Sequence, residues 1–217
     1  LRSYTVDSAG GGNDDGPRFP SHECVLQYLR RYAADNGIGP LVEFETEVIG
    51  VTKKGDGWTV ETRHRGVTRS REYRSVVVCN GHFSVRRELV LEGSESFSGL
   101  WTHSRDYRRP DRFGGMRVAV VGTGSSGFDL AVEISTVAEE VYWCGRDHTL
   151  VRPFEGVRGL FTAPMPSSLV DDHLSIGDRS VAVDAVVCCT GFHYDTRFID
   201  STVVTGVDAP TPLYRHL

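Results

Sequence analysis

The centre of the chain carries a short apolar run, then closely spaced glycines, then an amphipathic segment. Residues 118–121 read V-A-V-V, which is typical of a strand buried on both faces. Beyond the glycines, apolar residues recur at the spacing of one helix face; they are Phe128, Leu130, Ala131, Ile134 and Val137. The pattern predicts a strand, a tight turn and a helix.

The hydrophobic period changes to two between residues 41 and 78, with Gly55-Asp56-Gly57 as a turn. This alternation predicts a β-meander, followed by a buried strand at residues 76–78. The strands expected in the meander lie near residues 41–49, 58–62 and 67–73. A second buried run, residues 183–189, precedes Thr190-Gly191 and predicts another strand that ends in a turn.

One helix is expected before the meander. Ser21 is a suitable N-cap, and Asn36-Gly37 is a suitable stop. Between them, apolar residues follow helical spacing; they are Val25, Leu26, Leu29, Tyr32 and Ala33. Residues 1–20 are polar and rich in glycine, so we expect a loop there.

The central glycines have the spacing G-x-G-x-x-G, formed by Gly122, Gly124 and Gly127. Between a strand and a helix, this motif permits a tight turn, a close approach of backbone to a pyrophosphate, and close helix–strand packing. Ser125, Ser126 and the loop backbone would hold the pyrophosphate at the positive end of the helix. The alternative is a glycine-rich turn that binds nothing.

The next strand, residues 141–143, leads to Cys144-Gly145-Arg146. An NAD enzyme usually places an acidic residue here for the ribose 2′-hydroxyl, whereas a basic residue accommodates the 2′-phosphate of NADP. Arg146 offers a bidentate fork suited to phosphate, although Asp147 follows it. NADPH is therefore favoured over NADH.

Composition narrows the function classes. A formal net charge of -5 over 217 residues gives no reason to expect nucleic acid or an anionic membrane as partner. No apolar run approaches the length of a membrane span, and no signal-peptide pattern opens the chain. The 5 cysteines form no C-x-x-C, so we expect neither a zinc site nor a redox dithiol, but buried free thiols in a reducing cytoplasm.

A more specific pattern lies upstream of the glycines: Phe97-x-Gly99-x-x-x-His103-x-x-x-Tyr107. It resembles the fingerprint of the flavin-containing monooxygenases, the N,N-dimethylaniline monooxygenase-like enzymes that use FAD and NADPH. With Tyr107 at its last position, the fingerprint resembles that of the branch that oxygenates heteroatoms, since Baeyer–Villiger enzymes usually carry Trp there. The resemblance places the fingerprint in a linker beside the flavin–NADP interface, so we treat it as identifying and not as catalytic.

Other segments share the resemblance. Cys79-Asn80-Gly81-His82 is similar to the family's exit from the FAD domain, and Thr190-Gly191-Phe192 is similar to its return from the NADP domain. Asn80, Gly81, Thr190 and Gly191 would then lie at the FAD and its interface. By the same resemblance, the backbone at Val48 would contact the adenine of FAD.

The resemblance implies an α/β flavoprotein with two dinucleotide-binding domains. A Rossmann-like NADPH domain would be inserted in an incomplete FAD domain that carries the β-meander. We expect the partial FAD domain with the fingerprint linker at residues 1–112, the NADPH domain at 113–195, and the return to the FAD domain at 196–217.

The implied function is a monooxygenase that uses NADPH, FAD and O₂ to oxygenate a soft nucleophile, an amine nitrogen or a sulfide sulfur, of a small molecule. Two alternatives stay open. One is a non-catalytic NADP-binding fragment. The other is a flavoenzyme of the pyridine nucleotide-disulfide oxidoreductase kind, which the missing C-x-x-C disfavours. The substrate and the oligomeric state stay open.

The sequence departs from the family pattern in three places. No G-x-G-x-x-G precedes Gly122, so we expect that the start of the protein, with its FAD motif, is lacking. The segment 151–178 is short, either naturally or because part of the domain is absent. Leu1-Arg2-Ser3-Tyr4 matches a segment that usually ends in Asn, so Tyr4 stands where that amide reaches the flavin, unless the match is shifted by a residue or two.

Overall fold

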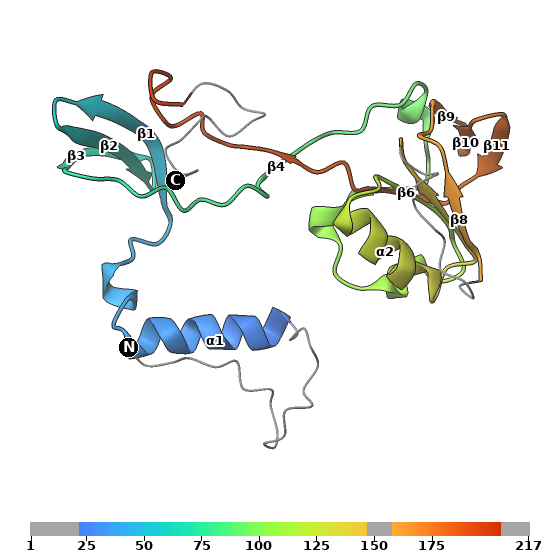
Figure 1. Cartoon of the computed structure of the whole chain (residues 1–217), viewed down its shortest axis with the longest axis horizontal. Coiled ribbons are helices and arrows are strands. Elements are labelled where there is room, and N and C mark those ends of the chain that lie inside the picture. Colours follow the sequence, from blue (N-terminus) through green and yellow to red (C-terminus); the bar gives the residue numbers. More distant parts are fainter. Residues whose placement is uncertain (1–21, 147–157, 205–217) are drawn as a thin grey trace, which may run out of the picture. The chain divides into compact units, whose positions relative to one another are not determined.

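The computed structural model describes residues 22–146 and 158–204. The chain divides into two compact units, Leu1–Ser75 and Val76–Leu217, and Figure 1 shows the elements of each. The domain boundaries expected at 112 and 195 stay predictions.

In the first unit, the predicted helix is present as α1 (His22–Asp35). It ends as expected: Gly37 has a φ of 62°, and the N–H groups of Gly37 and Ile38 donate to the carbonyls of Ala34 and Ala33. The short 3₁₀ helix η1 (Gly39–Leu41) follows. The expected N-cap Ser21 and the expected loop at 1–20 lie outside the described residues.

The predicted meander is an antiparallel sheet in the order β1 (Thr46–Lys54), β2 (Gly57–His64) and β3 (Val67–Tyr73). Its first strand begins later than expected, because Gly39–Leu41 is helical and Phe44 is exposed. A β-bulge interrupts the register between Val48 and Gly50, which bends the strand there.

The expected buried strand at residues 76–78 is wrong. These residues form no strand, and the side chains of Val77 and Val78 are 83% and 45% exposed. No strand of the described ranges 22–146 and 158–204 pairs with them. A strand needs a partner for its backbone hydrogen bonds, so an apolar run alone does not form one.

The second unit is built on a parallel five-stranded sheet, which contains the predicted strands at 118–121, 141–143 and 183–189. In spatial order its strands are β5 (Leu100–His103), β12 (Ala185–Cys188), β6 (Arg117–Val121), β7 (Glu140–Cys144) and β8 (Leu160–Ala163). β6, β7 and β12 are almost wholly buried, as continuous apolar strands of a covered parallel sheet should be.

The predicted helix α2 (Ser125–Ser135) covers one face of this sheet together with η4 (Pro110–Phe113) (Figure 1). Its C-terminal carbonyls are capped, since the hydroxyls of Ser135 and Thr136 donate to the carbonyls of Val132 and Glu133. A second meander packs on the other face: β9 (Ser168–Val170), β10 (His173–Ile176) and β11 (Arg179–Ala182). The short segment 151–178 supplies strand β8 and most of this meander.

The two segments that resemble domain exits lie side by side. Strand β4 (Val85–Arg86) pairs antiparallel with β13 (Phe192–His193). Around them, the Asn80 amide donates to the Asp195 carbonyl at 2.9 Å, and the Thr190 hydroxyl donates to the Arg87 carbonyl. Two more 3₁₀ turns, η2 (Ser94–Ser96) and η3 (Ser104–Asp106), flank β5.

Candidate functional site

The glycine loop lies at the carboxyl end of β6 and is held by the two neighbouring strands. The Gly122 N–H donates to the Cys144 carbonyl of β7 at 2.8 Å, and the Cys189 N–H donates to the Val121 carbonyl at 2.8 Å. Gly122 has a φ of 129°, and a Cβ there would lie 2.2 Å from the Cys189 carbonyl oxygen. Only glycine fits this position.

Gly127 allows the helix to approach the strand. A Cβ on this buried residue would lie 1.8 Å from the Gly122 carbonyl oxygen. Gly124 is different: it is exposed, its backbone is extended, and nothing lies within 4 Å of a Cβ built on it. The three glycines therefore serve three purposes: the turn, the open approach and the close packing.

The first turn of α2 is open to an anion. Gly124 is the N-cap and gives no side-chain cap, and the first turn contains no acidic residue. Ser125 and Ser126 are exposed there. The N–H groups of a helix's first turn have no partner within the helix and carry the positive end of its dipole, so this position suits a phosphate or pyrophosphate group.

The loop also lies where the strand order reverses. From β6, the chain continues through α2 to β7 on one side, whereas β12 lies on the other side. Ligands of open α/β sheets bind at such a switch point, at the carboxyl ends of the strands. The turn of Thr190 and Gly191 follows β12 at this edge, and Gly191 has a φ of 85°.

Arg146 lies at the same edge, two residues beyond β7, and is exposed. The preceding Gly145 lies against the loop, since a Cβ there would be 2.4 Å from Cγ2 of Thr123. Arg146 therefore follows directly after a residue that packs against the glycine loop.

The fingerprint residues do not form one cluster. Phe97 and Gly99 precede β5 at the amino edge of the sheet, where a Cβ on Gly99 would lie 2.5 Å from the Asp184 carbonyl oxygen. Ser98, which lies between these two residues, donates hydrogen bonds from its N–H and hydroxyl to Asp172 of the β9–β10 turn, at 2.9 and 2.8 Å. His103 ends β5 at the opposite, carboxyl edge.

His103 is 4% exposed, and its Nδ1 accepts from the Arg105 N–H at 3.1 Å. Its ring stands edge-on to Phe192 with the centroids 5.1 Å apart. Burial lowers the pKa of His103, and the nearby Arg86 lowers it further, against a smaller opposing effect of the Gly191 backbone. In the described part of the chain, no hydrogen bond of normal geometry reaches Nε2. Burial therefore favours the neutral form of the ring.

Tyr107 lies on the α2 side of the sheet, where its ring stacks on Phe113 with the centroids 6.0 Å apart. Burial raises the pKa of Tyr107, and the carboxylate of Glu133 adds to the rise. The hydroxyl has no hydrogen bond of normal geometry to any described residue. Tyr107 is thus a packing residue beneath the helix, away from the open side of the loop.

The residues expected at the FAD lie in both units: Val48, which is 41% exposed, lies in the first unit, and Asn80 and Gly81 lie in the second. Their contact with FAD stays a prediction. Gly81 has a φ of 69° with open space around it. Tyr4 lies outside the described residues.

Three of the cysteines, Cys144, Cys188 and Cys189, are buried, and burial raises the pKa of each thiol to about 12. None of the five cysteines, all of which lie in the described ranges, forms a disulfide. In the two described ranges, no group of His, Cys, Asp and Glu could hold a metal ion, and no helix is long and apolar enough to cross a membrane.

Sequence reasoning missed the residues that support the loop, which are Trp143, Gly145 and Cys189. Trp143 follows Val141 on the α2 face of β7, and its indole N–H donates to the Gly122 carbonyl. A tryptophan in an otherwise apolar buried strand is a signal that could have been used, because a buried indole N–H needs an acceptor.

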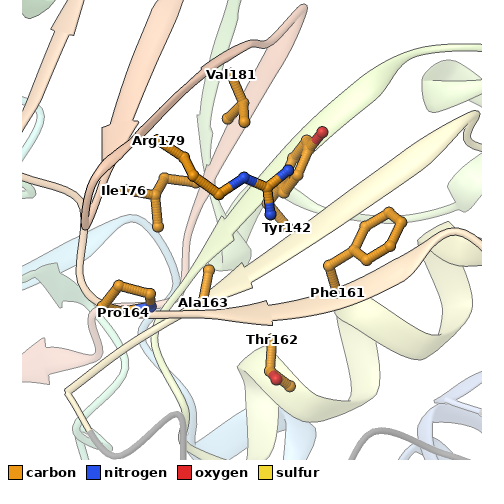
Figure 2. A pocket seen from close by; sticks show the side chains of 8 residues that line it. All are labelled: Tyr142, Phe161, Thr162, Ala163, Pro164, Ile176, Arg179 and Val181. Carbon is orange, nitrogen blue, oxygen red and sulfur yellow. The ribbon is translucent and has the colours of Figure 1, made fainter.

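A small pocket of about 70 Å³ lies on the other face of the sheet, between β8 and the second meander. Figure 2 shows Arg179 extending toward the Tyr142 ring, with Phe161 beside it. The Tyr142 hydroxyl donates to Glu140 at 2.6 Å. The pocket is too small for a nucleotide and lies on the face away from α2, so it is not part of the loop site.

The chain matches the family described as flavin-binding monooxygenase-like over residues 11–155. Among curated proteins, it is 35% identical to the flavin-containing monooxygenase FMO GS-OX-like 3 of Arabidopsis thaliana, over 99% of this chain and 50% of the relative. The chain thus spans about half the length of the curated relatives that it matches.

Two solved structures also match most of the chain. S-allyl-L-cysteine S-oxygenase from Allium sativum matches with a TM-score of 0.77 and 29% identity over 94% of this chain and 48% of that one. Tmm from a Pelagibacter strain matches with a TM-score of 0.82 and 26% identity over 92% and 47%. The expected fold class is confirmed: the architecture is that of flavoprotein monooxygenases with two dinucleotide-binding domains. The chain belongs to the flavin-binding monooxygenase-like family.

Proposed function

We propose that this chain provides the NADPH-binding part of a flavin-dependent monooxygenase, which uses NADPH, FAD and O₂ to oxygenate a soft nucleophile of a small molecule. The glycine loop is the observation that carries the proposal. It combines a Gly122 turn that excludes any side chain with an open Gly124 and an uncapped first turn of α2. These features fit a dinucleotide pyrophosphate.

The residues of the site have separate roles. The exposed backbone and hydroxyls of Ser125 and Ser126 would bind the pyrophosphate, and Arg146 would bind the 2′-phosphate of NADPH. Thr190 and Gly191 would fix the direction of the chain where it passes from the NADP domain back to the FAD domain, beside the loop. NADPH supplies the hydride, and FAD with O₂ supplies the oxygen atom, so the protein's part is to bind, orient and exclude water.

Flavin use follows from the family. Within the chain, the Asn80 amide donates to the Asp195 carbonyl. Val48, Asn80 and Gly81 as FAD contacts stay proposals, and so do the domain limits 1–112, 113–195 and 196–217 and a cytoplasmic location.

A sulfide is the better-supported substrate class. One structural relative is an S-oxygenase of S-allyl-L-cysteine, which is a thioether. A sulfide sulfur is a soft nucleophile, and its oxygenation requires no acid–base residue in the described chain. Amine oxygenation stays the second possibility.

A non-catalytic NADP-binding chain is the alternative from a different class, and it would share the loop site. A disulfide-reductase function is disfavoured, because the sequence has no C-x-x-C and the adjacent thiols of Cys188 and Cys189 are buried with pKa values raised to about 12.

The cofactor assignment is tested by titrating NADP⁺ and NAD⁺ into the wild-type chain and into Arg146→Ala by calorimetry. The wild type should prefer NADP⁺. Loss of a charge-assisted contact should weaken NADP⁺ about ten- to a hundredfold and leave NAD⁺ unchanged. Arg179→Ala, which removes an equal charge on β11, is the matched control. Equal affinities of the wild type for both nucleotides would refute the assignment.

A further inference from the structure

We infer that Trp143 is a positioning residue that holds the glycine loop in its nucleotide-binding conformation through its indole N–H. The inference deepens the proposed function and rests on it for the identity of the nucleotide. Trp143 does not reach the open side of the loop, because it is 2% exposed and lies beneath it on β7.

Two consecutive residues of β7 hold both polar backbone groups of Gly122. The Trp143 Nε1–H donates to the Gly122 carbonyl at 2.9 Å, and the Cys144 carbonyl accepts from the Gly122 N–H at 2.8 Å. With both groups bound to one strand, the two peptide planes that flank Gly122 are fixed relative to the sheet.

The indole also contacts the start of α2. A Cβ on Gly127 would lie 3.2 Å from Trp143 Nε1, so the helix backbone passes directly over the ring. The ring of Phe128 meets the indole edge-on, with the centroids 5.8 Å apart and an interplanar angle of 69°. The same side chain therefore touches the first and the third glycine of the motif.

The N–H group is needed as well as the ring. The Gly122 carbonyl points toward the helix backbone, close enough that a methyl group on Gly127 would lie 1.8 Å away. If the indole donor is removed, the peptide gains freedom to rotate and a partly buried carbonyl loses a hydrogen bond. The following residues, Gly124 to Ser126, would then no longer be preordered for the pyrophosphate, and binding would have to order them.

Two replacements separate the donor from the ring. Trp143→Phe removes the N–H and part of the ring. Incorporation of 3-benzothienylalanine at position 143 replaces the N–H by sulfur and keeps the shape, so it also covers the case in which Trp143→Phe fails to fold. Ile134→Val is the packing control, because Ile134 is fully buried in the same core but lies away from the loop.

Two measurements on the full 217-residue chain test the inference. Hydrogen exchange at the amides of Gly122 and Phe128 reports the loop and the first helical hydrogen bond without any nucleotide. Titration with NADP⁺ reports binding. Both replacements should accelerate exchange at these two amides about tenfold and weaken NADP⁺ about five- to tenfold, whereas Ile134→Val should change neither.

The outcomes are distinct. If the sulfur analogue exchanges at both amides like the wild type and binds NADP⁺ equally well, the indole N–H does not position the loop and the inference is wrong. If the wild type binds no NADP⁺ but both replacements accelerate exchange, the proposed function fails while the role of Trp143 in the loop stands.

Discussion

The carboxylate of Asp184 accepts three hydrogen bonds from Arg117. The Arg117 backbone N–H and Nε donate to one oxygen at 2.8 and 3.1 Å, and a terminal guanidinium nitrogen donates to the other at 2.9 Å. The Asp184 N–H donates to the Arg117 carbonyl at 2.8 Å. The two residues join the amino ends of β12 and β6, the central strands whose opposite ends hold the glycine loop.

Replacing Asp184 should weaken the contact between the amino ends of β12 and β6. Hydrogen bonds from Arg117 hold the pKa of Asp184 below its usual 3.8, so the stability that they contribute is present above that pH and is lost as pH falls through the lower, folded-state pKa. We expect Asp184→Asn to cost about 1 kcal/mol at pH 7, after allowance for solvent screening of a side chain that is 41% exposed. Urea unfolding measures it, and an equal stability of both proteins at pH 7 would contradict it.

Alanine should have different effects at Gly127 and at Gly124 of the glycine motif. A methyl group on Gly127 would collide with the Gly122 carbonyl, so Gly127→Ala should destabilise the fold by about 3 kcal/mol. Gly124→Ala meets nothing within 4 Å and should change stability by less than about 0.5 kcal/mol. It should nevertheless weaken NADP⁺, because the methyl group stands on the open side of the loop. Thermal unfolding with calorimetric titration separates the two effects; unaltered stability of Gly127→Ala would show that the helix start can move.

We expect the stability of the folded chain to depend on pH because of the buried His103. Its pKa is lowered in the folded state from 6.5, chiefly by burial. A folded protein that resists protonation loses stability as pH falls below the unfolded value, so the loss should begin near pH 6.5 and continue toward pH 5. His103→Asn removes the titrating ring but can still accept from the Arg105 N–H, so its stability should fall less between pH 7 and 5. Urea midpoints at the two pH values give the comparison, and parallel curves would assign the dependence to other groups.

The purified chain should not retain stoichiometric FAD. No G-x-G-x-x-G precedes Gly122, and Val48 and Asn80 can supply only scattered backbone contacts. The preparation should therefore be colourless. An absorption spectrum checks it, and a yellow protein that keeps its flavin through dialysis would contradict the expectation.

Local patterns in the sequence determined most of the elements around the site. The strand at 118–121, the glycine turn and the helix follow from apolar periodicity and glycine spacing, which act over a few residues. The apolar pattern predicts a helix that reaches Val137, but α2 ends at Ser135. The first meander and the end of α1 at Gly37 follow from alternation and turn chemistry in the same way.

Tertiary structure decided what those patterns leave open. Residues 76–78 have the composition of a buried strand but form none, because strand formation depends on a partner that local sequence does not specify. The support of Gly122 by Trp143 and Cys189 joins residues 21 and 67 positions apart, which only the strand order brings together. Likewise, the fingerprint reads as one motif, but β5 separates its residues to opposite edges of the sheet, because an extended strand carries its two ends apart.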